Sequence, residues 1–337
     1  MDDLRPRYAK DDSDDVGTIG TAGRGDRRGR SAMRPSDIPA RSWKDIVRRV
    51  YRGITDDRIL ANAGAVVFYA LLALFPGIAA LVSIYALFAD PRSIAEHLDT
   101  LAGILPGGAI DIVRDQLGRL TSQPAGNLGI GLVISLGVSL WSANGGIKAL
   151  FDALNVVYRE REARGFILLN AVSLVFTVGF IAFLLLALAA LIALPAVLDY
   201  LPASVAELLD YARWPVLLVV VAAALALIYR YGPSRAEPRW RWISWGSIFA
   251  ALGWIVASAL FSWYATNFGS FNKTYGSLGA VIGFMMWMWL SVIVVLIGGR
   301  LNAEIERQTT RDSTEGRPEL LGRRGASMAD TVGQAQD

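Results

Sequence analysis

Four polar residues recur along one otherwise apolar segment and could contact an ion or a polar substrate: Asn144, Lys148, Asp152 and Asn155. Their spacings of 4, 4 and 3 residues put them on one face of a helix, here called the polar face. Polar groups are costly in hydrocarbon. The polar face therefore needs water at the membrane surface, a water-filled cavity, or polar partners on another helix.

The position of Lys148 along its helix bears on this choice. Counted from Leu128, Lys148 lies about 30 Å along the helix axis, close to the edge of a hydrocarbon layer of similar thickness. This placement favours a wet surface, or a vestibule large enough for a headgroup, over an ion site at the bilayer centre. Cavity and helix-contact interpretations remain open.

Four further polar residues lie in or beside apolar segments: Asn62, Tyr69, Asn302 and Glu304. Asn62 and Tyr69 are two helical turns apart and share a face. If these four converge with the polar face, they would line a substrate path able to hold an anionic headgroup. We expect no catalytic residue, metal site or cofactor among them.

Proline and glycine pairs predict how the helices bend and pack. Pro76-Gly77 should break the hydrogen-bond ladder of its helix midway, and Gly145-Gly146 should loosen the helix just before Lys148. Gly279 and Gly283 have the spacing that permits close helix packing. The two pairs are candidate hinges, and the last two glycines are candidate packing positions.

The elements that position these residues are long apolar segments. Hydrophobic residues make up 53% of the chain and the mean hydropathy is +0.39, which excludes an ordinary soluble domain. Backbone polar groups in lipid must be satisfied internally, so spans are helices of about 20 residues. We predict an all-α membrane protein with six transmembrane helices, at about 60–89, 125–148, 166–195, 211–231, 242–266 and 276–300.

Loop charges predict the orientation. The loop 158–165 holds three arginines and 230–241 holds four, whereas 90–123 has three arginines against five acids. Positive residues favour the cytoplasmic side, so we expect both termini in the cytoplasm. The outward-facing loops should contain short amphipathic helices, two within 93–120 and one started by the capping pair Ser204 and Glu207.

The ends of the chain are polar. Residues 1–40 and 308–337 have few large apolar residues and are predicted to be disordered cytoplasmic tails, which leaves 41–307 as the transmembrane domain. The basic residues between Lys44 and Arg58 could attract anionic lipid at the inner leaflet. A net charge of +3 is too small to indicate a nucleic-acid partner, and the sequence leaves the oligomeric state open.

Three blocks carry a resemblance: AGAVVFYALLALFPGIAAL at 63–81, SANGGIKALFDALNVVY at 142–158, and 246–306 with YGSLGA and LNAE. Over residues 45–307 the chain resembles the YihY/BrkB family of multi-pass bacterial inner-membrane proteins, which includes virulence factors. The resemblance implies six spans with both ends inside. The family often has Ala-Glu before Leu-Asn, where this chain has Gly299-Arg300, so a carboxylate role does not transfer to position 300.

The family has also carried a ribonuclease label. Histidine-based metal hydrolysis needs several converging ligands, and this chain has one histidine, His97, and no cysteine. We therefore expect no enzyme. Two hypotheses follow: a transporter that translocates or exports an amphipathic envelope substrate such as a lipid or lipid-linked anion, or a non-catalytic scaffold that docks an envelope protein partner through 93–120.

Overall fold

The computed structural model describes residues 28–85, 128–198, 202–267 and 279–335. These residues are helical apart from the connecting and terminal segments, which include one isolated antiparallel bridge between Pro238 and Thr314. The short helix η1 spans Pro35–Asp37. The α-helices are α1 (Ala40–Asp56), α2 (Ile59–Tyr85), α5 (Leu128–Tyr158), α6 (Phe166–Leu198), α7 (Ala203–Tyr231), α8 (Trp240–Asn267) and α10 (Gly279–Glu306). The all-α prediction is confirmed for this part of the chain.

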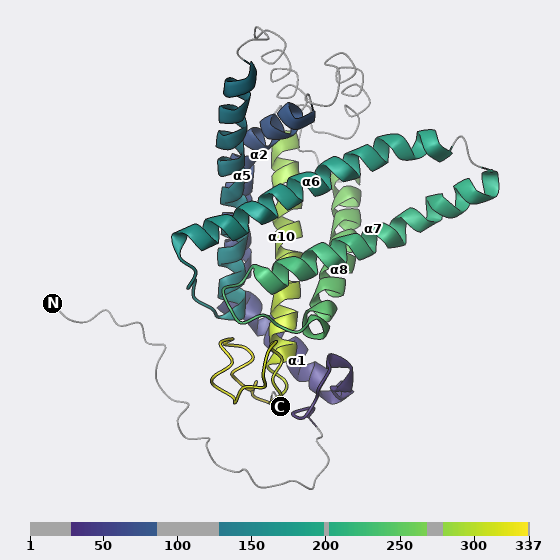
Figure 1. Ribbon diagram of the computed structural model, residues 1–337. Helices are drawn as coiled ribbons and strands as arrows, with labels where there is room; N and C mark the ends of the chain where they lie inside the picture. Colours follow the sequence, from purple (N-terminus) through teal and green to yellow (C-terminus); the bar gives the residue numbers. More distant parts are fainter. Residues whose placement is uncertain (1–27, 86–127, 199–201, 268–278, 336–337) are drawn as a thin grey trace, which may run out of the picture.

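Helix α10 is central, and the other long helices are arranged around it (Figure 1). It packs against α8, α2, α5 and α1, while α2 and α5 pack along each other. Helix α6 packs on α5, and α7 packs on α8. In Figure 1, α6 and α7 run obliquely to the upright helices α5 and α10.

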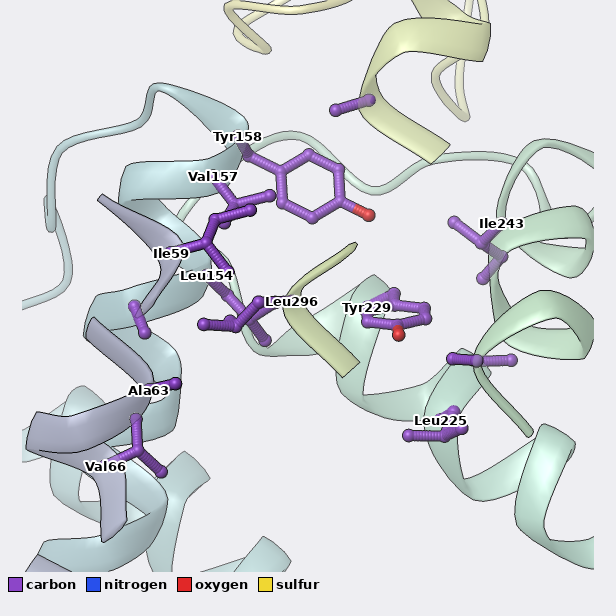
Figure 2. Packing of buried hydrophobic residues seen from close by; sticks show 14 of the residues in the cluster. Ile59, Ala63, Val66, Leu154, Val157, Tyr158, Leu225, Tyr229, Ile243 and Leu296 are labelled. Carbon is purple, nitrogen blue, oxygen red and sulfur yellow. The ribbon is translucent and has the colours of Figure 1, made fainter. Parts of the chain in front are cut away.

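The largest apolar core lies where five helices meet (Figure 2). Ile59 of α2, Leu154 of α5 and Leu296 of α10 are completely buried there, and Tyr229 of α7 donates a 2.6 Å hydrogen bond to the carbonyl oxygen of Val295. Outside this core the helices expose large apolar side chains, among them Ile167 and Val175 of α6. An apolar exterior over a packed core is typical of helices in lipid.

One end of the bundle carries the charged segments. We call the structure formed by α1 and residues 159–165, 232–239 and 307–335 the basal end. Its segments are joined by hydrogen bonds: Ala163 N–H donates to Ser234 Oγ (3.1 Å), Ser327 N–H to Glu160 Oε1 (2.6 Å), and Arg239 to the carbonyl of Thr314 (2.9 Å). The arginine-rich loops 158–165 and 230–241 thus lie at the same end, as the orientation prediction requires.

Each of the six expected spans contains one long helix. By length and apolar composition, three stretches among the described residues suffice to cross a membrane: Phe166–Leu186, Trp240–Ala265 and Val281–Glu306. Ile59–Ala73 and Pro215–Tyr231 are shorter apolar stretches. The number six and the cytoplasmic orientation therefore remain predictions, and the expected amphipathic segment 93–120 lies outside the described residues.

The predicted boundary between a short helix after residue 202 and a span at 211–231 is wrong. Helix α7 begins at Ala203 after Pro202, which provides no side-chain cap, and it continues to Tyr231. Ser204 therefore lies inside the helix and does not begin a separate short one. A proline before the first turn fixes φ at a value compatible with the start of a helix. It has no backbone N–H, but an N–H at this position would have no partner within the helix.

The expected disorder of residues 28–40 and 308–335 is also corrected, while 1–27, 336 and 337 lie outside the described residues. Arg324 is 6% exposed, and its guanidinium donates to the carbonyls of Ala329 and Thr310, both at 2.6 Å. Arg30 donates to the carbonyl of Gly333 (2.6 Å), and the hydroxyl of Thr309 donates to that of Ala32 (2.7 Å). Side chain to backbone bonds order these two polar segments against each other, where composition alone predicts no core.

Candidate functional site

A pocket of about 240 Å³ opens at the basal end. Five of its lining residues are arginines and two are carboxylates: Arg49, Arg52, Asp56, Arg159, Arg300, Glu304, Arg307 and Gln334. They come from α1, the turn after α5, the last turns of α10 and the C-terminal segment. Segments distant in sequence thus concentrate positive charge in one hollow, a chemistry suited to an anion.

A buried ion-pair network forms one side of this pocket. Arg49 Nε lies 2.5 Å from Glu304 Oε2, and Arg300 Nη2 lies 2.8 Å from Glu304 Oε1. Arg300 Nη1 also lies 2.8 Å from Asp57 Oδ2 and donates to the carbonyl of Val157 (3.1 Å). Arg300 therefore ties the α1–α2 junction, α5 and α10 together.

The local sequence explains how these groups meet. In α1 the buried residues are Ser42, Ile46, Arg49 and Gly53, which form one helical face. A Cβ at Gly53 would overlap Arg300 Nε. Glycine at this position therefore leaves room for the Arg300 side chain. Burial raises the pKa of the Asp57 carboxyl, and the neighbouring Arg300 and Arg159 charges oppose that rise. Asp57 is thus held as a partner for Arg300 at a desolvation cost.

A second buried pair lies nearby. Arg235 Nη2 is 2.7 Å from Glu306 Oε2, and both side chains are fully buried. The Arg235 guanidinium also lies 5.0 Å from the centroid of the Tyr158 ring, a cation–π distance. The pair connects the 232–239 segment with the end of α10, so it fixes the basal end rather than opening to the pocket.

The first two residues of the polar face contact another helix. Thr177 of α6 donates from its hydroxyl to Asn144 Oδ1 (3.2 Å), and Lys148 Nζ donates to Asn170 Oδ1 of α6 (2.5 Å). Asn144 is 2% exposed, and Lys148 also lies 5.1 Å from the Trp141 ring centroid. Of the three interpretations the sequence left open, the structure favours polar partners on another helix for Asn144 and Lys148.

The other two polar-face residues behave differently. Asn155 is 3% exposed; its amide nitrogen donates to Glu162 (3.0 Å) and its oxygen accepts from Ser234 N–H (2.7 Å). Asp152 is exposed. Asn155 therefore organises the basal loops, and the four residues do not line one cavity.

The remaining path candidates are dispersed. Asn62 donates to the carbonyl of Asp57 (2.8 Å), and Tyr69 is 48% exposed with its ring against Phe68. Asn302 is fully buried and accepts a 2.7 Å hydrogen bond from Gly246 N–H. Of the eight predicted residues, Glu304 is the one that lines the arginine pocket.

The candidate hinges lie within continuous helices. Helix α2 runs through Pro76 and Gly77 without interruption, although it bends toward its C-terminal end (Figure 1). Helix α5 likewise runs through Gly145 and Gly146. A Cβ on Gly146 would lie 3.4 Å from the Cα of Ala70, so this glycine permits close contact between α5 and α2.

The closest packing of α10 involves a glycine other than Gly283. A Cβ on Gly283 would meet nothing within 4 Å, and Gly279 begins the helix. A Cβ on Gly298 would lie 2.5 Å from the Tyr229 hydroxyl and 2.7 Å from Ala250 Cβ, and one on Gly246 would overlap the Gly298 carbonyl. The tight α8–α10 contact is therefore at Gly246 and Gly298.

Sequence reasoning missed most of the pocket. Arg49, Arg159, Arg307 and Gln334 come from four segments. From the sequence, Arg49 and Arg159 counted only toward the orientation, Gln334 only as part of a tail, and Arg307 was not a candidate. One available signal was the buried face of α1, on which Arg49 follows Ile46 by 3 residues. In the described residues no group of three or more His, Cys, Asp or Glu could hold a metal ion.

Comparison with known proteins decides the family. The model of the virulence factor BrkB family matches residues 50–320. The chain belongs to this family. BrkB-family relatives include the putative ribonuclease-like protein YfkH of Bacillus subtilis, which is 30% identical over 260 residues, 74% of this chain and 90% of that protein. No solved structure matches.

Other relatives are described as membrane proteins. The UPF0761 membrane protein Mpe_A1422 of Methylibium petroleiphilum is 25% identical over 82% of this chain and 66% of its own length. The UPF0761 membrane protein PSHAa0171 of Pseudoalteromonas translucida is 25% identical over 81% of this chain and 88% of its own length. With the apolar helices described above, these matches make the chain a membrane protein of the BrkB family.

Proposed function

We propose that this BrkB-family chain is a multi-pass bacterial inner-membrane protein that translocates or exports an amphipathic, anionic envelope substrate. The six spans would be α2, α5, α6, α7, α8 and α10, with the basal end in the cytoplasm. The positive-inside rule supports this orientation, because the loops 158–165 and 230–241 belong to the basal end.

The observation that carries the proposal is the arginine-lined pocket at the basal end of an apolar bundle. An amphipathic substrate needs a polar site for its headgroup and an apolar environment for its tail. Arg49, Arg300 and Arg159 supply positive charge at the pocket, and the exposed apolar side chains of α6 and α7 supply the apolar environment. The pocket would select the headgroup at the point of entry.

A non-enzymatic role is part of the proposal. The chain has one histidine and no cysteine, and the pocket charges suit binding of an anion. The basic and aromatic residues of α1 would contact the inner leaflet: Lys44 is exposed, and Tyr51 is 75% exposed on the same helix.

The test is transport by purified protein in liposomes. A fluorescent anionic phospholipid should cross the bilayer faster in protein-containing vesicles than in protein-free ones, and a zwitterionic analogue should cross more slowly than the anionic one. Equal rates with and without protein would contradict translocation. If the rates were equal, and a protein lacking residues 93–120 failed to complement the loss of the gene in cells, the scaffold hypothesis would be favoured.

A further inference from the structure

The basal pocket holds more positive charge than its own carboxylates can neutralise. Five arginines line it, against Asp56 and Glu304. Glu304 is already shared, because Arg49 and Arg300 both contact its carboxylate. Asp57, just outside the lining, is paired with Arg300. Arg49 and Arg300 thus share the carboxylate of Glu304 on one side of the pocket.

Arg307 lies among these charges at the pocket. It follows α10 directly, and its Nε donates to the neutral hydroxyl of Thr331 (3.1 Å). Burial is the main cause that lowers the pKa of Arg307; Glu304 opposes this shift, and the charges of Arg159, Arg49 and Arg300 add to it. A bound anion would compensate this mutual repulsion.

Arg159 gives an independent geometrical indication. It is the first residue after α5 and has a φ of 56°, in the left-handed region where helices usually place glycine. Glu160 N–H donates to the carbonyl of Asn155 (2.8 Å). This hydrogen bond caps the C-terminus of α5 with Arg159 in the left-handed conformation. A long charged residue kept in a conformation that suits glycine, with its side chain at a pocket, is a reason to infer a function for that side chain.

We propose that the basal pocket binds a phosphate-type oxyanion, a phosphomonoester or phosphodiester group, and that Arg159 and Arg307 are its principal ligands. Guanidinium groups donate paired hydrogen bonds whose geometry matches phosphate oxygens. The volume of about 240 Å³ is below the roughly 300–1,000 Å³ of sites for drug-sized ligands, so the pocket would take a headgroup or a small anion and leave acyl chains outside.

The source of the phosphate group is either a lipid headgroup or a free phosphate compound. The binding itself is independent of transport, while the role of the anion as a translocated headgroup rests on the proposed function. The test therefore measures binding and transport separately.

Full-length protein in nanodiscs of zwitterionic lipid is titrated with inorganic phosphate, pyrophosphate and glycerol 3-phosphate at constant ionic strength, with chloride as the reference anion. A second series incorporates increasing fractions of phosphatidylglycerol. The readout is the thermal unfolding midpoint, which rises when a ligand binds only the folded state. We expect the midpoint to rise with the phosphate compounds, with the anionic lipid, or with both.

The informative variant is Arg159→Gly. Glycine suits the left-handed backbone at this position, so the fold should be retained while the ligating charge is lost. Arg307→Gln tests the second ligand. Arg161→Gln, at an exposed site two residues away, is the matched control for charge. We expect the apparent affinity to fall at least about tenfold in the first two variants and to stay unchanged in the third.

The outcomes separate two questions. A response to phosphatidylglycerol alone assigns the pocket to a lipid headgroup, and competition by free phosphate assigns the same site to both. No response above chloride in the unmodified protein, or equal responses in Arg159→Gly, Arg307→Gln and Arg161→Gln, would overturn the site. Binding without lipid transport supports the site and contradicts the proposed function. Transport that is unchanged in Arg159→Gly supports translocation and contradicts a role of this site in it.

Discussion

Arg300 and Asp57 form a buried ion pair, with 2.8 Å between Nη1 and Oδ2 and side-chain exposures of 2% and 7%. The pair joins the last turns of α10 to the junction between α1 and α2. A positive charge is thus buried at position 300. Its neighbours, Glu304 and Asp57, supply the compensating negative charge.

Arg300→Met should strongly destabilise the protein. Removal of one partner leaves Asp57 buried without its main compensating charge, which costs about 3–5 kcal/mol for buried pairs in general. Thermal unfolding in detergent measures the loss. Arg161→Met, an exposed arginine-to-methionine change in the 159–165 segment, should leave the midpoint nearly unchanged; a similar fall in both variants would contradict a structural role for the pair.

Gly298→Ala should destabilise the α8–α10 contact. The added Cβ would lie 2.5 Å from the Tyr229 hydroxyl and 2.7 Å from Ala250 Cβ, and overpacking costs about 1–3 kcal/mol. Gly283→Ala is the matched control on the same helix, because its Cβ would meet nothing within 4 Å and alanine favours helix by up to about 1 kcal/mol. If both variants lowered the unfolding midpoint equally, Gly283 would also be a packing position.

Thr177→Val should weaken the α5–α6 contact. Valine keeps the shape but removes the hydroxyl that donates to Asn144 Oδ1 at 3.2 Å, and such bonds between membrane helices contribute about 0.6 kcal/mol on average and up to about 1.7. Thr177→Ser retains the donor. A serine variant less stable than the valine variant would show that the methyl group, and not the hydrogen bond, matters at this contact.

Arg324→Met should release the C-terminal segment. Its guanidinium donates to the carbonyls of Ala329 and Thr310, both at 2.6 Å, and no other group replaces these donors in the variant. Limited proteolysis should cut residues 308–337 faster than in the unmodified protein. Arg323→Met, at the exposed neighbouring residue, should keep the original rate; rapid cleavage of the unmodified protein would mean that this segment is not held.

Glu162→Gln should destabilise the protein at neutral pH and less so in acid. The hydrogen bond from the Arg164 guanidinium is the main reason that the pKa of Glu162 falls from 4.5 to about 2. A carboxyl with a lowered pKa stabilises the fold above its unfolded pKa and loses this contribution as the pH falls toward the folded value. The difference between the unfolding midpoints of the two proteins should therefore shrink from pH 4.5 to about 2; a constant difference would contradict the ion pair.

The positions of the long helices could be predicted from the sequence, because each requires only a run of apolar residues. The predicted segment 166–195 and α6 at Phe166–Leu198 illustrate this agreement. The order of the C-terminal segment could not be predicted, since Thr309 and Arg324 stabilise it through hydrogen bonds to backbone carbonyls 277 and 14 residues away in the sequence. Amino-acid composition indicates how much apolar surface a segment can bury, but it does not indicate which side chains will hydrogen-bond to backbone carbonyls.

The sequence by itself determined that this is an apolar, helical membrane protein with a polar face on Leu128–Tyr158, because hydropathy and the 3.6-residue period are local properties. The tertiary structure decided what that face contacts: α6 meets Asn144 and Lys148, while the basal loops meet Asn155. It also decided where the charged site lies. Arg49, Arg159 and Arg307 become neighbours only when α1, α5 and α10 converge, and the charge of a pocket depends on distances in space that sequence separation does not contain.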